Sequence, residues 1–303
     1  MPHLFDAYII VDWSASAKPT AGANSIWIGT LAQDKRRNFK FTATNPKTRL
    51  EAREIISKTI RKRVSRGDKV LAGFDFALGY PAGTAAAIGL SKANEPAWRM
   101  MHAYLATKVE ERLDNSNQRF ALAAEMNQAI SAGPHPFWGA PKRNITKTLS
   151  PKKGAFAFGT LREHRVAEEW IKSAFKANPK SVWQLLGAGA VGSQTLLGIP
   201  TVHALRADIQ NSQIWPFETG FKPLSRKDLE PVSCVFAEIY PSTIQTRPKK
   251  DEILDRAQVR TLAKRLQILD SRGDLAEAFG PPDSLDKRKI PQIISEEGWI
   301  LAK

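Results

Sequence analysis

The chain has 303 residues, which is long enough to bury a sizeable core, and its 42% hydrophobic and 25% charged residues are typical of a globular protein. No apolar stretch approaches the roughly 20 residues of a membrane span, and the N-terminus has no secretory signal. The single Cys234 excludes an intrachain disulfide and a multi-cysteine metal site. These features predict a cytoplasmic protein that does not enter the membrane.

The charge is strongly positive, with 45 Lys and Arg against 30 Asp and Glu, a formal net charge of +15. A surface this basic predicts a polyanionic partner, most simply nucleic acid. The alternative is a basic protein without such a partner.

The first predicted element is a buried strand over residues 8–12, in which Ile9, Ile10 and Val11 run directly into Asp12. An apolar, β-branched run of this kind is typical of a strand covered on both faces. The strand would present Asp12 at its exposed C-terminal end. Asp12 could instead simply begin a turn, for which aspartate is well suited.

Two strands over residues 25–31 and 38–44 alternate apolar and polar side chains, which predicts an antiparallel meander with the first strand. Thr48 and Glu51 form a capping-box pattern that begins a helix ending near Gly67. The next apolar strand, residues 69–75, ends in Asp75. A strand reached through a helix suits a parallel crossover, so we expect Asp12 and Asp75 at the same edge of the sheet.

The middle of the chain is predicted to be helical over residues 83–132 and irregular over residues 133–158. Proline, glycine, aromatic and basic residues, including Lys142 and Arg143, are interleaved in the irregular part. Such a composition suits a loop that stacks on bases and contacts phosphates; the alternative is an ordinary connection with buried aromatic residues. A helix over residues 161–176 comes next.

A predicted strand over residues 181–186 leads into Gly187, Gly189 and Gly192, which match the dinucleotide-binding pattern GxGxxG, with Asp208 about 20 residues further on. We do not favour a dinucleotide site, because Pro200 would break the following helix early. A tight glycine turn against packed backbone or a ligand is the preferred interpretation.

Further strands are predicted over residues 214–220 and 233–239, and the second of these presents Glu238 before a proline-containing turn. The last long helix is predicted over residues 253–272, with its C-terminal signal at Gly273. Asp255 shares one face of this helix with Val259 and Leu262. A carboxylate on a buried face needs a partner or a metal, although the helix dipole alone also favours an acid near the helix N-terminus.

Asp12 after its strand, the segment from Asp75 to Pro81, and the segment from Glu238 to Pro241 together resemble a family of uncharacterised proteins described as predicted ribonuclease H-like nucleases. The resemblance implies a ribonuclease H-like α/β fold, a mixed five-stranded sheet in the order 3-2-1-4-5 flanked by helices. It places the matching acidic positions at Asp12, Asp75 and Glu238, and more weakly at Asp255. We therefore expect one elaborated domain spanning residues 1–303, with its core at about 5–90 and 180–272 and a largely helical insertion at about 91–180.

Crowded carboxylates repel one another unless cations lie between them, and hard oxygen ligands select Mg²⁺ or Mn²⁺. Two such ions can activate water and stabilise the leaving oxygen of a phosphodiester. The hypothesis is a metal-dependent nuclease in which Asp12, Asp75 and Glu238 bind the metal and Asp255 is a fourth ligand.

Two other hypotheses fit the same residues. Sugar kinases and related ATPases grip ATP phosphates with a small-residue hairpin after a first-strand Asp, and Ser14, Ser16 and Lys18 look similar to that hairpin; a nucleotide would then be the partner and Asp75 the base. The third hypothesis keeps the fold without catalysis, as a module that binds nucleic acid or a small ligand.

Overall fold

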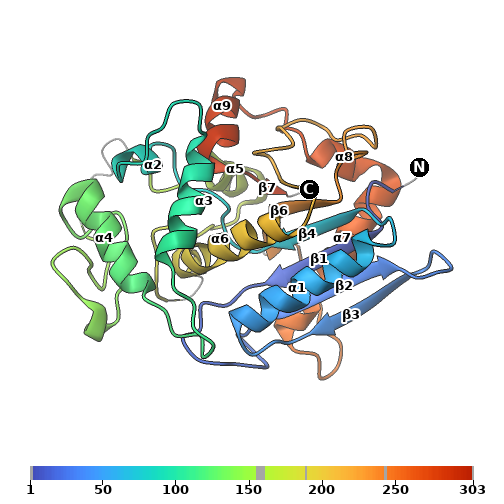
Figure 1. Ribbon diagram of the computed structural model, residues 1–303, viewed down its shortest axis with the longest axis horizontal. Helices are drawn as coiled ribbons and strands as arrows, with labels where there is room; N and C mark the ends of the chain where they lie inside the picture. Colours follow the sequence, from blue (N-terminus) through green and yellow to red (C-terminus); the bar gives the residue numbers. More distant parts are fainter. Residues whose placement is uncertain (1–2, 155–160, 188–189, 242–243, 302–303) are drawn as a thin grey trace.

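The computed structural model describes residues 3–154, 161–187, 190–241 and 244–301. Its centre is a mixed sheet of seven strands (Figure 1). The strands are β1 (Ala7–Asp12), β2 (Trp27–Gln33), β3 (Phe39–Thr44), β4 (Val70–Phe74), β5 (Ser212–Ile214), β6 (Cys234–Ile239) and β7 (Ile300–Leu301).

The sheet order is β3-β2-β1-β4-β6-β5, with β7 also paired to β6. β1, β2 and β3 form the predicted antiparallel meander, and β4 returns parallel to β1. The expected five-stranded order 3-2-1-4-5 is wrong, because β6, not the fifth strand of the chain, lies beside β4. β5 and β7 have only three and two residues, too few to show an alternating pattern in the sequence.

Helices cover both faces of the sheet (Figure 1). The longer ones are α1 (Arg49–Val64), α3 (Ala97–Lys108), α4 (Arg119–Ser131), α5 (Val166–Phe175), α6 (Val191–Asp208) and α7 (Leu254–Arg272). The short ones are α2 (Thr84–Ala87), α8 (Asp274–Ala278) and α9 (Ile290–Gln292), with single turns at Lys142–Asn144, Lys287–Lys289 and Ile293–Glu297. No helix in the described ranges combines the length and the apolar character needed to cross a membrane.

Alternation along β1 and β4 divides the core between the two faces. Ile10 and Leu71 pack with Val259 of α7, whereas Val11 and Phe74 pack on the other side of the sheet with Ile56 of α1. Successive side chains of a strand point to opposite faces, so these contacts fix which face every neighbouring residue meets. A third apolar cluster joins α3, α4 and part of α6 with residues such as Phe137 and Trp183.

The N-cap at Thr48 and the end of α7 at Gly273 are confirmed, whereas the Glu51 carboxylate accepts the Lys47 N–H and does not complete a capping box on Thr48. The Thr48 hydroxyl accepts a hydrogen bond from the Glu51 N–H and begins α1, and α7 ends at Gly273, whose φ of 84° suits glycine.

Two predicted strands and one predicted helix break are wrong. Residues 181–186 form turns with only an isolated bridge at Gln184. Val182 and Trp183 gave this segment the apolar character of a strand, but they pack in the third apolar cluster and not in the sheet. Most of residues 214–220 also lie in turns, and β5 ends at Ile214. Helix α6 continues through Pro200.

Candidate functional site

Asp12 and Asp75 meet where β1 and β4 end. The two strands are parallel, Val11 is in register with Phe74, and the Asp75 N–H donates to the Val11 carbonyl at 3.3 Å. Asp12 is the last residue of β1 and Asp75 directly follows β4, and each comes one residue after the Val11–Phe74 pair, so their side chains leave the sheet on the same face. Residues far apart in the sequence are thereby neighbours, as the parallel crossover predicts.

The carboxyl groups of Asp12 and Asp75 lie within hydrogen-bonding reach of each other, and such a bond needs one of the two to be protonated. Burial raises the pKa of Asp12, and the negative charges of Asp75 and Asp255 raise it further. Burial also raises the pKa of Asp75, while the Trp13 N–H, which donates to Asp75 Oδ1 at 2.7 Å, favours its ionised form. The pair therefore holds a proton at a pH where isolated aspartates are ionised.

Asp255, in the first turn of α7, approaches this pair from the facing helix. Its Oδ2 accepts the Asn24 N–H at 2.6 Å, and its charge acts on both Asp12 and Asp75. A pocket of about 420 Å³, which we call the carboxylate pocket, opens between these elements. Its lining includes Asp12, Ser14, Ser16, Arg119, Gln194 and Asp255. Asp75 is joined to this lining through its hydrogen bond to Asp12.

The loop after Asp12 is stabilised by hydrogen bonds from Arg49 of α1. Arg49 is 1% exposed and donates to the Ser14 and Ser16 carbonyls at 3.0 and 2.7 Å, while Glu111 binds the rest of its guanidinium. The hydroxyls of Ser14 and Ser16 bond within the loop, to the carbonyls of Asn24 and Lys18. The Lys18 side chain is exposed and lies outside the pocket lining. The loop is thus a rigid wall of the pocket.

Glu238 does not join the other acids. It is in register with Phe74, one residue before Asp75, so it points to the opposite face of the sheet. There Arg165 binds it with two hydrogen bonds, of 2.8 and 2.6 Å. Burial raises the pKa of Glu238, and the guanidinium opposes part of that shift. In the sequence, all three acids stand at the end of a predicted strand. The register of the strands, which differs by one residue for Glu238, cannot be read from the sequence.

The carboxylate oxygens around Asp12 are the type of ligand that Mg²⁺ and Mn²⁺ prefer, but they are too few to fill the coordination shell of an ion. Carboxylate oxygens are hard ligands, and a cation could take the place of the proton that Asp12 and Asp75 share. Within the described parts of the chain, no three His, Cys, Asp or Glu side chains are grouped to hold one ion. Mg²⁺ is commonly bound by one or two carboxylates together with water and substrate phosphate, so two carboxylates and an open pocket fit it.

Arg119, the first residue of α4, lines the same pocket as Asp12 and Asp255 and was not predicted from the sequence. Nothing in its sequence surroundings distinguishes it from an ordinary basic residue at a helix start. Burial lowers the pKa of Arg119 to about 10, and neighbouring Arg49 and Arg143 lower it too. The charge of Arg143 therefore acts on Arg119, but neither Arg143 nor Lys142 of the same turn is part of the pocket lining.

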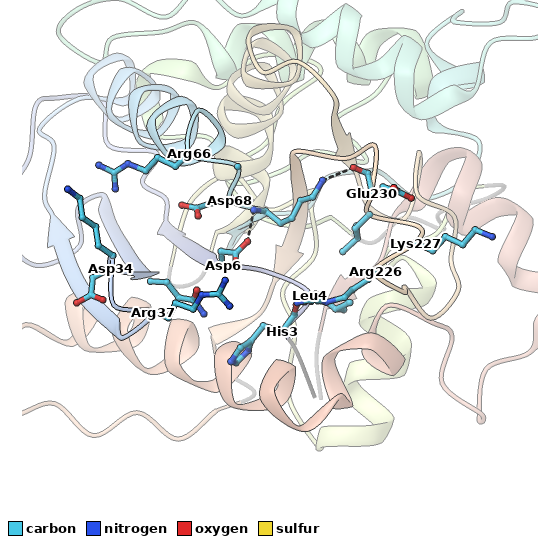
Figure 2. Close-up of a pocket in the computed structure, with 15 residues that line it drawn as sticks. His3, Leu4, Asp6, Asp34, Arg37, Arg66, Asp68, Arg226, Lys227 and Glu230 are labelled. Atoms are coloured by element: carbon cyan, nitrogen blue, oxygen red, sulfur yellow. Dashed lines mark hydrogen bonds between the residues drawn. The ribbon is translucent and has the colours of Figure 1, made fainter.

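A second pocket, of about 730 Å³, lies at the other end of β1 and β4, and we call it the strand-start pocket. Figure 2 shows its lining, which includes Asp6, Arg37, Arg66, Asp68, Lys69 and Arg226. Asp6 Oδ2 accepts the Lys69 N–H at 2.9 Å, and Lys69 Nζ donates to the Glu230 carbonyl at 2.7 Å. Asp68 forms a 2.7 Å ion pair with Arg63. The acids here already have partners.

The glycine pattern at residues 187–192 is a packing feature at its described positions. A Cβ on Gly192 would lie 2.4 Å from the Val182 carbonyl oxygen, so only glycine fits there. Gly189 lies outside the described residues. A dinucleotide-binding unit requires a strand of the sheet directly before its glycine turn. Residues 181–187 contain no such strand.

Comparisons of the chain with protein-family models, with curated proteins and with solved structures gave no significant match.

Proposed function

We propose that the protein is a divalent-cation-dependent phosphoesterase whose active site is the carboxylate pocket. The observation that carries this proposal is that Asp12 and Asp75 meet at the ends of adjacent parallel strands, with Asp255 close enough for its charge to act on both. Two carboxyl groups that share a proton are a poor arrangement for stability alone, because each is kept from ionising by the other. Such groups are candidates for a functional site.

Each acid has a distinct position in this proposal. Asp12 and Asp75 would hold the cation, and Asp75 is oriented for this by the Trp13 N–H. Asp255, fixed by the Asn24 N–H, stands across the pocket, where its carboxylate can accept a proton from a water molecule. When bound, Mg²⁺ or Mn²⁺ would polarise a phosphoryl oxygen and lower the pKa of bound water.

Three finer expectations belong to this proposal. The fold is ribonuclease H-like, which is supported by the 3-2-1-4 order of the first four strands and the position of the acids at their ends. The substrate is a nucleic acid or a nucleotide, which is supported by the net charge of +15. The protein acts in the cytoplasm.

The test is hydrolysis of single-stranded and duplex DNA and RNA with Mn²⁺ or Mg²⁺, with Mn²⁺ binding followed separately by electron paramagnetic resonance. We expect Asp12→Asn to abolish both cleavage and Mn²⁺ binding without unfolding the protein. The matched control is Asp114→Asn, which changes an exposed carboxylate and should alter neither. Undiminished cleavage by Asp12→Asn would refute the proposal.

ATP-dependent phosphotransfer is the second candidate, because Ser14 and Ser16 line the same pocket as Asp12. It has less support, since their hydroxyls are bonded within the loop and Lys18 lies outside the pocket. Thermal stabilisation by ATP and Mg²⁺, together with no binding of DNA or RNA, would favour this candidate. A non-catalytic binding module would be indicated by nucleic-acid binding with no cleavage under any metal.

A further inference from the structure

Arg119 is a nearly buried cation held by neutral groups. Its side chain is part of the carboxylate pocket, yet the residue is only 7% exposed. Nε donates to the Ser193 hydroxyl at 2.9 Å, Nη1 donates to Asn117 Oδ1 at 3.0 Å, and the guanidinium lies 4.5 Å from the centre of the Phe120 ring. These contacts fix the direction of the guanidinium without neutralising it.

Neighbouring charges do not neutralise Arg119 either. Over the described ranges, no carboxylate lies within ion-pair distance of it, and the nearby Glu111 is already bound by Arg49. Arg49 and Arg143 add further positive charge nearby. Removing a charge from water without a partner is costly, so an anion entering the pocket would be stabilised by Arg119.

We infer that Arg119 binds the anionic phosphoryl group of the substrate inside the carboxylate pocket. The planar guanidinium has five N–H donors and matches phosphate oxygens, and Nη2 remains available beside the two nitrogens that are already bonded. Arg119, Asp12 and Asp255 line the same pocket, so a phosphorylated ligand bound there would enter the site of the proposed cation. This inference rests on the proposed function for the identity of the reacting group.

The pocket also limits the substrate. A volume of about 420 Å³ lies within the usual range for small-ligand sites and is enough for a ligand of nucleotide size. The ligand chemistry is therefore a phosphoryl group on a nucleotide-sized body, either a free mononucleotide or the phosphorylated end of a single strand.

The test is binding of AMP, and of a 5′-phosphorylated single-stranded oligonucleotide, by isothermal titration calorimetry at pH 6 with EDTA. We expect Arg119→Met to weaken binding by about tenfold or more, Arg119→Lys to retain part of it, and the loss to shrink as salt is raised. The matched control is Arg66→Met, which removes an exposed cation from the strand-start pocket and should leave binding unchanged.

A Ser193→Ala variant separates charge from structure, because it removes one support of Arg119 but keeps the cation; we expect a smaller loss than with Arg119→Met. AMP binding without binding of the oligonucleotide identifies a free nucleotide, and the reverse identifies a strand end. The inference is overturned if neither probe binds, or if Arg119→Met and Arg66→Met weaken binding equally. Since no divalent cation is present, the result does not depend on whether the protein hydrolyses anything.

Discussion

Strands β1 and β4 carry an aspartate at or beside each end, and the two ends differ in how those acids are satisfied. Where the strands begin, Asp6 (Figure 2) accepts the Lys69 N–H, and Asp68 pairs with Arg63. Where they end, Asp12 and Asp75 face each other, and within the described structure neither has a cation at ion-pair distance. The same residue type in the same pair of strands therefore plays two roles.

The difference arises from the segments that flank the two strands. The start of β4 is preceded by the C-terminus of α1, which supplies Arg63 to Asp68. The end of β1 leads into the loop that buried Arg49 supports, and Arg49 binds backbone carbonyls and Glu111 instead of Asp12. Asp68 is neutralised by its ion pair, whereas within the described structure Asp12 and Asp75 have no cation at ion-pair distance, which is why we propose them as ligands of a bound cation.

The largest expected effect is a loss of hydrolysis when the aspartate at the end of β4 is replaced, with no loss when the aspartate before its start is replaced. Asp75→Asn should lower Mn²⁺-dependent hydrolysis by on the order of a thousandfold, because it removes charge that would hold the cation. Asp68→Asn, at the other end of the same strand, should leave kcat/KM unchanged. Steady-state kinetics on a fluorescent oligonucleotide would measure both. Equal losses in the two variants would show that the two ends do not differ in function.

The next effect concerns Glu238, the strand-end acid that forms an ion pair, with Arg165. Arg165→Met should destabilise the protein by about 3–5 kcal/mol, because it leaves Glu238 and Glu168 buried without their counter-charge. Urea unfolding followed by circular dichroism would measure it. Arg288→Met, which breaks an exposed pair with Asp286, should have no measurable effect. Unchanged stability of Arg165→Met would contradict a structural role for Glu238.

The smallest effect is a dependence on pH without metal. The folded state raises the pKa of Asp12 above its ordinary 3.8, so folding favours the protonated form. That stability is present below pH 3.8 and is lost as the pH rises through the folded-state pKa. Between pH 5 and 8 in EDTA, we expect the free energy of unfolding of the wild type to fall more steeply than that of Asp12→Asn, by up to about 1.4 kcal/mol per pH unit. Parallel curves for the two proteins would argue against the shared proton.

Much of the fold is encoded in local patterns. The meander of β1 to β3, the parallel return of β4, the cap at Thr48 and the end of α7 at Gly273 are all local signals in the sequence, and the structure confirms them. The short β5 and β7 could not be predicted, because two or three residues carry no periodicity. The place of β6 beside β4 is a matter of long-range pairing that no local pattern specifies.

For the site, the order of residues along the chain was enough to show that acids come after apolar strands and that Asp255 shares a face of its helix with Val259. Which of these acids meet depends on the folded arrangement. Parallel register and side-chain alternation bring Asp12, Asp75 and Asp255 to one face and turn Glu238 to the other, toward Arg165. Arg119, a cation that lines the same pocket, comes from helix α4. Its burial, without a counter-ion at ion-pair distance in the described structure, is set by packing and not by any local pattern.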